Sequence, residues 1–453
     1  MKKIALILAL IFFISSVTSE APAASPTNEE LLKEIQSLKS RITQLEKKLQ
    51  KEPDVEIVPE KKYLAKETGK PSEWIECSPG EGFVIKPLDL ACIPYGTLVI
   101  QGTPDANNPG DAGKAQCDGS YKIDIDLEKK FWDWGYAFCE FEIGDGSTIE
   151  DVLSVFSNVD QNVSLTDSRV EVTKVWYDQY LFNKQITIGV GKWDPTDWMD
   201  ENNFAGCDNT QFLGRLFKRS PVIEWPEGNT IGARAEICFE PVNFLDFTVG
   251  YFDSETDYRR VFEHNVYTFQ MKVMPATLMK WDPEQWEGNY RLYSWMNMRN
   301  HQRLVDEGDA PSNKTNERNF GFGFNFDQKI TDIFGVFGRF GWQRPDIMPA
   351  SGGPTLEWFW SSGLQATGKY WNREGDVIAC GIGQIFPSRQ YGKAGNPDGA
   401  EGHIEMYYNC KINDYIHISP DFQIIWNPNG VIKPSEGDDD AVFVYGVRAY
   451  LGF

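Results

Sequence analysis

Charged residues that alternate with apolar ones are the residues of this sequence best suited to contact a solute. Arg234 and Glu236 share one face of "GARAEI", because successive side chains of a strand point to opposite faces. A cation beside an anion offers hydrogen-bond donors and acceptors with little net field, which suits a neutral solute rich in hydroxyl groups. By the same parity, the other candidates on polar strand faces are Arg339, Glu405, Asp421, Gln423 and Arg448.

The segment from Trp193 to Phe212 is the candidate for a loop that folds inward and narrows a channel. Trp193, Asp194 and Trp198 combine a carboxylate with aromatic faces, which together offer both hydrogen-bonding and apolar contacts to a solute. The plainer interpretation is that inward charges belong to a solvated wall and that most aromatics form membrane-interface girdles. A register slip of one residue would invert every assignment of face.

The elements that must position these residues are strands with one apolar face and one polar face. In the final stretch "VFVYGVRAYLGF", every second residue counted back from Phe453 is apolar or aromatic. The same period recurs in "QITIGVGKW" from 185, "NFGFGFNF" from 319 and "HIEMYYNCKI" from 403. A row of Phe opposite Gly and Asn is hard to bury in a water-soluble protein. We therefore expect the apolar face to meet lipid and the polar face to enclose water.

Composition favours a membrane barrel. The chain is 41% hydrophobic with a mean hydropathy of -0.42. No apolar run of about 18 residues follows the amino terminus, which excludes helical membrane spans. Aromatic residues reach 14%, with 15 Trp, 18 Tyr and 29 Phe, which fits girdles at two membrane interfaces. An aromatic-rich soluble β-protein, such as a lectin or propeller, is the alternative that composition leaves open.

The predicted fold is an all-β transmembrane antiparallel barrel over residues 95–453. Allowing about 21 to 22 residues for each strand with its connection gives about 16 strands, and about 14 or about 18 would also fit. Side chains cannot fill an interior of that width, so we expect an aqueous channel that loops must narrow.

Other segments precede the predicted barrel. Residues 1–23 have the pattern of a secretory signal peptide, with cleavage after either Ser19 or Ala23. Residues 53–94 are expected to form a linker and a candidate plug segment. The chain is therefore predicted to be exported and to reach the bacterial outer membrane.

Residues 25–52 are predicted to form a periplasmic coiled coil, because Leu and Ile recur from Leu31 to Leu49 with spacings of four and three. Ile at a with Leu at d favours two strands, whereas "RITQLE" resembles a pattern of short trimeric coiled coils. We favour a homo-trimer. A single amphipathic helix is the alternative, since so few heptads are only marginally stable.

The eight cysteines of an exported chain are expected to form disulfides, with Cys77 and Cys92 as the first candidate pair. No Cys-x-x-Cys occurs and the chain has only four His, so we expect no haem, no zinc cluster and no other cofactor. The formal charge of -22 argues against nucleic acid as a partner and against a dedicated anion channel.

Four stretches carry a recognisable family pattern: "DQYLFNKQITIGVGKWDPTDWMDENNFAGCDNTQFLG" from 178, "PEGNTIGARAEI" from 226, "VGYFDSE" from 249 and "EMYYNCKINDYIHISPDFQIIWNPNG" from 405. They resemble the carbohydrate-selective porin family of the OprB type, and the last stretch is the most specific. The resemblance covers roughly Gly119 to Phe453. The coiled coil, the linker and the cysteines depart from the family pattern.

The resemblance implies a 16-stranded outer-membrane barrel through which small sugars diffuse, with loops folded into the lumen and without catalysis. The implied partners are small sugars, outer-membrane lipids and the barrel-assembly machinery, which would recognise the strand that ends at Phe453.

Two other classes of function compete. The first is a general or cation-preferring porin that also tethers the outer membrane through its coiled coil. The second is an outer-membrane enzyme, but none of the four His lies in a Gly-x-Ser-x-Gly type context, so no catalytic residues are expected.

Overall fold

The computed structural model describes residues 74–453 apart from 109, 163–167, 227, 239–243, 256–258, 260, 283–284, 307–311 and 433–440. The predicted signal peptide (1–23), the predicted coiled coil (25–52) and residues 53–73 of the predicted linker lie outside the described residues. These three assignments therefore stay predictions.

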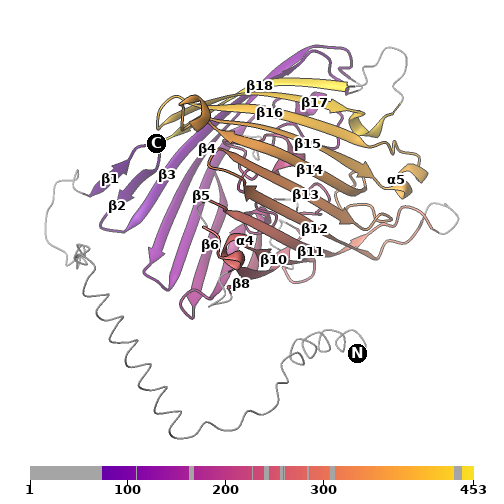
Figure 1. Ribbon diagram of the computed structural model, residues 1–453. Helices are drawn as coiled ribbons and strands as arrows, with labels where there is room; N and C mark the ends of the chain where they lie inside the picture. The colour runs from indigo at the N-terminus through magenta and orange to yellow at the C-terminus, as the bar shows by residue number, and fades with distance from the viewer. Residues whose placement is uncertain are drawn as a thin grey trace, which may run out of the picture. The chain divides into compact units, whose positions relative to one another are not determined.

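Sixteen antiparallel strands close into a barrel, which confirms the fold class and the strand number expected from the sequence (Figure 1). Each strand pairs with the next along the chain, and the last strand pairs with the first, with Val447 aligned to Ile100. The barrel strands are β3 (Leu90–Thr103), β4 (Gln116–Phe131), β5 (Gly135–Asp145), β6 (Glu171–Leu181), β7 (Ile186–Trp193), β8 (Thr230–Cys238), β9 (Leu245–Asp253), β10 (Asn265–Val273), β11 (Gly288–His301), β12 (Glu317–Lys329), β13 (Phe334–Gln343), β14 (Leu356–Thr367), β15 (Val377–Pro387), β16 (Glu401–Lys411), β17 (Ile416–Trp426) and β18 (Ala441–Gly452).

A hairpin of β1 (Ile75–Ser78) and β2 (Gly82–Ile85) extends the sheet before the first barrel strand. β2 pairs with the beginning of β3, where Phe83 aligns with Cys92. β18 pairs with the same edge of β3 further along and ends where Gly452 aligns with Tyr95. The candidate plug in this region is thus a hairpin of the sheet, and the first barrel strand begins at Leu90, earlier than the predicted boundary at 95.

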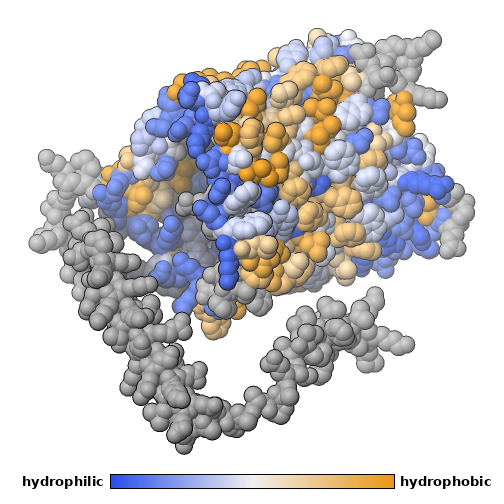
Figure 2. All heavy atoms as spheres, viewed as in Figure 1, coloured by the Kyte–Doolittle hydropathy of each residue, from blue (hydrophilic) through white to orange (hydrophobic). Residues whose placement is uncertain are grey.

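The two faces of the strands follow the predicted parity. On β12, Phe320, Phe322 and Phe324 are exposed on the outside, whereas Asn319 and Asn325 are buried inside. The final strand alternates in the same way, with an exposed outer row of apolar and aromatic residues around the buried Arg448. Figure 2 shows apolar residues gathered over the strands of the visible face, with hydrophilic residues toward both ends.

Most connections at the end where β3 begins are short turns, although β10 and β11 are joined there by the longer stretch 274–287, and longer loops connect the strands at the other end. In the turn between β6 and β7, Phe182 and Asn183 have φ of 52° and 54°, the left-handed conformation that suits a tight hairpin. Among the described residues, no helix is both long and apolar enough to cross a membrane. The short helices are η2 (Glu150–Val152), η3 (Pro195–Asp197), α3 (Arg215–Lys218), α4 (Pro275–Met279), η4 (Gly368–Trp371), α5 (Arg389–Lys393) and η5 (Pro428–Gly430).

The connection between β7 and β8, residues 194–229, folds into the barrel and is called the constriction loop below. Its buried Phe212, Leu216 and Phe217 pack against side chains of β13 to β16. Glycines of β15 make room for this contact, because a Cβ at Gly381 would lie 2.7 Å from Cδ1 of Phe217 and one at Gly383 would lie 3.0 Å from Cδ2 of Leu216. One side of the lumen is therefore filled by an apolar core.

The predicted Cys77–Cys92 disulfide is absent. All eight cysteines lie among the described residues and all are free thiols. Cys77 of β1 and Cys92 of β3 both align with Phe83 of the intervening β2. Two strand spacings place their Cα atoms roughly 9 to 10 Å apart, beyond the reach of a disulfide.

Candidate channel constriction

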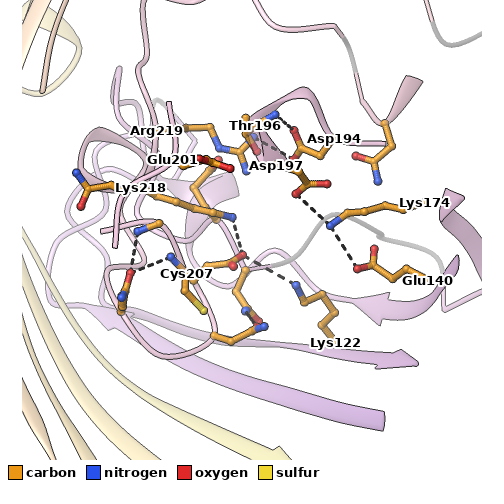
Figure 3. Close-up of a pocket in the computed structure, with 18 of the residues that line it drawn as sticks. Lys122, Glu140, Lys174, Asp194, Thr196, Asp197, Glu201, Cys207, Lys218 and Arg219 are labelled. Atoms are coloured by element: carbon orange, nitrogen blue, oxygen red, sulfur yellow. Dashed lines mark hydrogen bonds and ion pairs between the residues drawn. The ribbon is translucent and has the colours of Figure 1, made fainter. Parts of the chain in front are cut away.

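A cavity of about 550 Å³ lies inside the barrel between the constriction loop and the inner face of β3 to β6 (Figure 3). It occupies the side of the lumen opposite to the apolar core formed with β13 to β16. Its lining is polar and charged. The charged lining residues are Lys122, Glu140, Glu142, Lys174, Asp194, Asp197, Glu201, Asp208, Lys218 and Arg219.

Ion pairs join the barrel wall to the constriction loop across this cavity. Lys174 Nζ of β6 lies 3.4 Å from Asp197 Oδ1 of the loop and 3.3 Å from Glu140 Oε2 of β5. Asp208 Oδ2 of the loop lies 2.9 Å from Lys218 Nζ and 4.0 Å from Lys122 Nζ of β4. Figure 3 shows the two wall lysines pointing toward the loop carboxylates.

Strand parity and helix geometry place these side chains. The inner row of β4 carries Lys122, because the alternate Ile123 and Ile125 are exposed on the outer face, and the inner row of β5 carries Glu140. In the loop, α3 turns Leu216 and Phe217 into the apolar core, while Lys218 reaches the cavity. Asp194 caps η3 by accepting a hydrogen bond from the Thr196 amide at 2.9 Å.

The loop carboxylates have different proton affinities. Burial would raise the pKa of Asp208, but the cations of Lys218 and Lys122 outweigh it and hold the pKa well below its ordinary value. Burial raises the pKa of Asp197 to about 6, although Lys174 opposes the shift. Asp208 is therefore a fixed negative charge, whereas Asp197 gains its proton at mildly acidic pH.

Of the residues predicted to touch a solute, Asp194 lies on the cavity, 3.7 Å from Arg219. Trp193 is fully buried in an aromatic cluster with Trp198, whose ring centroid lies 4.2 Å away. Arg234 lies over the ring of Trp198, with its guanidinium carbon 4.1 Å from the ring centroid. These two tryptophans therefore have little face left for a sugar.

The predicted partnership of Arg234 and Glu236 is present in the structure, at 3.0 Å between Nη1 and Oε2. A second carboxylate that the sequence analysis missed, Asp178 of β6, lies 2.9 Å from Nη2 of Arg234. The pair belongs to the inner wall, and neither residue is among those that line the cavity.

The other inward candidates hold loops against the wall. Arg339 donates to Asp200 Oδ1 at 3.2 Å and to the carbonyl oxygen of Phe217. Glu405 accepts from the amides of Leu213 at 2.6 Å and Gly214 at 2.8 Å.

Arg448 donates to the carbonyl oxygens of Asp208 and Gln211, both at 2.7 Å. Gln423 donates to the Val159 carbonyl oxygen at 2.8 Å and to Asp421 at 2.9 Å. The alternation of the strands thus predicted correctly that these candidate side chains point inward, but the loops cover them and separate them from the cavity.

Apart from Asp194, the charged residues that line the cavity were not named as candidates, although the sequence held a signal for some of them. "YKIDIDLEKKF" alternates with the period of a strand, and that alternation places Lys122 inside. "FCEFEIG" places Glu140 and Glu142 inside in the same way. No periodic signal marks Asp208 or Lys218, because they lie in a loop.

One group of possible metal ligands occurs among the described residues, formed by Glu236, Cys238 and Asp246 within 4.8 Å of one another. The ammonium of Lys272 lies 2.8 Å from Asp246 Oδ2 and already supplies a cation there. The group therefore carries no metal assignment.

Comparison with known proteins gives one family and a set of similar folds. The family model described as "Carbohydrate-selective porin, OprB family" matches residues 117–453. OprB of Pseudomonas putida, in its high-pH structure, has a TM-score of 0.65 at 15% identity over 80% of this chain and 94% of that chain. The outer membrane channel DcaP of Acinetobacter baumannii has a TM-score of 0.50 at 10% identity over 82% of this chain and 99% of that chain. These likenesses show the fold. No curated relative matches the chain.

Proposed function

The chain belongs to the OprB family of carbohydrate-selective porins, and from this premise we propose that small neutral sugars diffuse through the cavity beside the constriction loop. Family and fold indicate an outer-membrane channel rather than an enzyme. The finer assignment, that the cavity is where solutes are selected, is the proposal.

The paired charges around the cavity are the observation that supports this proposal. Lys122, Lys174 and Lys218 each lie within 4.0 Å of a carboxylate, so donors and acceptors stand side by side. A sugar hydroxyl both donates and accepts, and it can exchange with such a pair without a large change in field. Each contact is replaceable by water, which keeps binding weak enough for passage.

The aromatic side chain that we propose to contact the apolar side of a sugar ring is one that the sequence analysis did not name. Trp193 and Trp198 are covered by each other and by Arg234, which argues against sugar stacking on them. Tyr95 of β3 lines the cavity and is the aromatic side chain available there.

The test compares sugar passage and ion conductance in planar bilayers and liposomes. Lys122→Met combined with Lys174→Met removes the wall donors of the cavity, and we expect monosaccharide flux to fall relative to ion conductance. Lys114→Met is the control, because Lys114 is exposed and pairs with Asp111 in the connection between β3 and β4. Wild-type monosaccharide flux no faster than that of a general pore of equal conductance would overturn the assignment.

A second candidate is a cation preference of the same channel, because carboxylates outnumber basic groups in the lining. Reversal potentials in a salt gradient measure this preference directly. A strong cation preference combined with sugar flux that the lysine variants leave unchanged would favour the general porin.

The assignments outside the barrel interior are also proposals. Removal of residues 1–23 on export, trimer formation through residues 25–52, contact of the outer face with lipids and recognition of β18 by the assembly machinery follow from the sequence patterns. Deletion of residues 25–52 should convert the detergent-solubilised complex from trimer to monomer by light scattering. An unchanged mass would reject the coiled coil as the trimerising element.

A further inference from the structure

One short segment of the constriction loop, residues 207–214 before α3, is fastened to the barrel wall by two side chains of neighbouring parts of the sheet. Glu405 of β16 and Arg448 of β18 contact this segment from two strands of the inner face that lie on either side of β17. Both side chains are fully or almost fully buried, at 0% and 1% exposure. Neither residue lines the cavity, so neither touches a solute there.

The two contacts are complementary, because one side chain accepts hydrogen bonds from the segment and the other donates to it. The Glu405 carboxylate accepts the consecutive amides of Leu213 and Gly214 at 2.6 and 2.8 Å. The Arg448 guanidinium donates to the carbonyl oxygens of Asp208 and Gln211 at 2.7 Å each. The carboxyl oxygens of Glu405 thus accept from amides of the segment, while the guanidinium of Arg448 donates to its carbonyls. Hydrogen bonds to charged groups are stronger than neutral ones.

The segment 207–214 contains one charged residue of the cavity lining, Asp208, and lies just before another, Lys218. Asp208 offers its backbone carbonyl to Arg448 and its side chain to Lys218 and Lys122. Lys218 follows directly in α3, which begins after Gly214. A displacement of this segment from the wall would move the cations and the carboxylate that face the cavity.

We propose that Glu405 and Arg448 are positioning residues that set the aperture of the channel by clamping residues 207–214 of the constriction loop. The inference rests on the proposed function of the cavity but concerns the wall that holds it. When the clamp is weakened, the loop leaves the wall more often and the channel opens to a wider conductance level.

Glu405→Gln is the first variant. It keeps the side-chain volume, but its NH₂ group replaces one of the two oxygens that accept hydrogen bonds from the backbone amides of Leu213 and Gly214. A buried backbone amide that loses its acceptor shifts the ratio of clamped to released loop by roughly tenfold or more. We expect single-channel recordings to show a higher-conductance level whose occupancy rises by that factor. Discrimination between a monosaccharide and a trisaccharide should fall in parallel.

Gly214→Ala is an independent second variant that leaves the wall unchanged. A Cβ at Gly214 would lie 2.6 Å from Glu405 Oε2 and 2.8 Å from His403 Cε1, so it pushes the segment off the clamp. The backbone φ of -66° accepts Ala without strain. Gly110→Ala, where a Cβ meets nothing within 4 Å, and Glu374→Gln, in an exposed turn, are the matched controls.

Barrel integrity is checked separately by heat-modifiable migration in gels, so that misfolded protein is not scored. The proposal is supported if both clamp variants, but neither control, populate the wider level in intact barrels. It is overturned if intact barrels of both variants keep the wild-type conductance distribution. A wild type that shows no sugar discrimination, with variants that still widen, would reject the proposed function and leave the clamp standing.

Discussion

Removal of the Arg339 side chain should release the constriction loop inside an intact barrel. Arg339 Nε lies 3.2 Å from Asp200 Oδ1, and both side chains have 0% exposure. The guanidinium also donates to the carbonyl oxygens of Asp200, at 3.1 Å, and of Phe217. Arg339→Met therefore leaves a buried carboxylate without its cation and two loop carbonyls without this donor.

The magnitude follows from the burial of the pair. Removing one partner of a buried ion pair costs about 3 to 5 kcal/mol, which corresponds to a roughly 10²- to 10⁴-fold change in the docked fraction of the loop. Asp200 keeps hydrogen bonds from Ser220 N at 2.6 Å and Asn325 Nδ2 at 2.7 Å, so the lower part of this range is expected. Asp200→Asn together with Arg339→Met removes both charges and should be milder than the single variant.

Trypsin provides the assay, because Arg215, Lys218 and Arg219 lie in or beside α3 and are cleavable only when the loop leaves the lumen. Cleavage is followed in detergent by mass spectrometry, while heat-modifiable migration reports the closed barrel. Arg344→Met is the control, since Arg344 is paired but partly exposed and an exposed pair is worth about 0 to 1 kcal/mol. Cleavage of Arg339→Met at the wild-type rate, or a double variant more sensitive than the single one, would refute the reasoning.

Three further predictions use the same interior. Gly381→Val places side-chain atoms where Phe217 now packs, and it should raise conductance without unfolding the barrel; unchanged single-channel currents would contradict the packing argument. Cys207 lines the cavity, so a cationic thiol reagent should lower conductance in the wild type but not in Cys207→Ser, and equal inhibition of both would exclude this cysteine. The pKa of Asp197 is raised to about 6, so its negative charge is present at neutral pH and is lost as the pH falls through about 6. Cation preference, measured by reversal potentials, should therefore weaken between pH 7.5 and pH 5, and Asp197→Asn should remove most of that change.

The barrel could be predicted from the sequence because the period of two is a local signal. The stretches around Phe322, Met406 and Val447 each show an apolar outer row, and each lies in a strand with that row exposed. The hairpin before β3 was missed because "IECS" and "GFVI" are too short to show a period. Its place in the sheet depends on pairing with β3, which no local pattern reports.

The candidate site was predicted only in part, for a reason that lies in tertiary packing. Parity fixes whether a side chain points inward, and it did so correctly for Glu405, Arg339 and Arg448. It cannot tell which inward residues a loop will cover, because that depends on contacts between positions far apart in sequence. Glu405 and Leu213, for example, are separated by 192 positions and still form a hydrogen bond. The lining residue Asp208 reaches the cavity only because the loop docks as it does.

The hairpin of β1 and β2 separates the barrel from any force that acts on the preceding part of the chain. Tension applied through the residues before Trp74 enters at β1, whose outer edge is unpaired among the described residues. Such a force must first break the pairing of β1 with β2 and then the pairing of β2 with the beginning of β3, one residue pair after another. The pairing of β3 with β18, which closes the barrel, lies further along the same edge of β3 and bears the force only after β2 has separated from β3. The pairing order therefore places the hairpin between the preceding chain and the strand pair that closes the barrel.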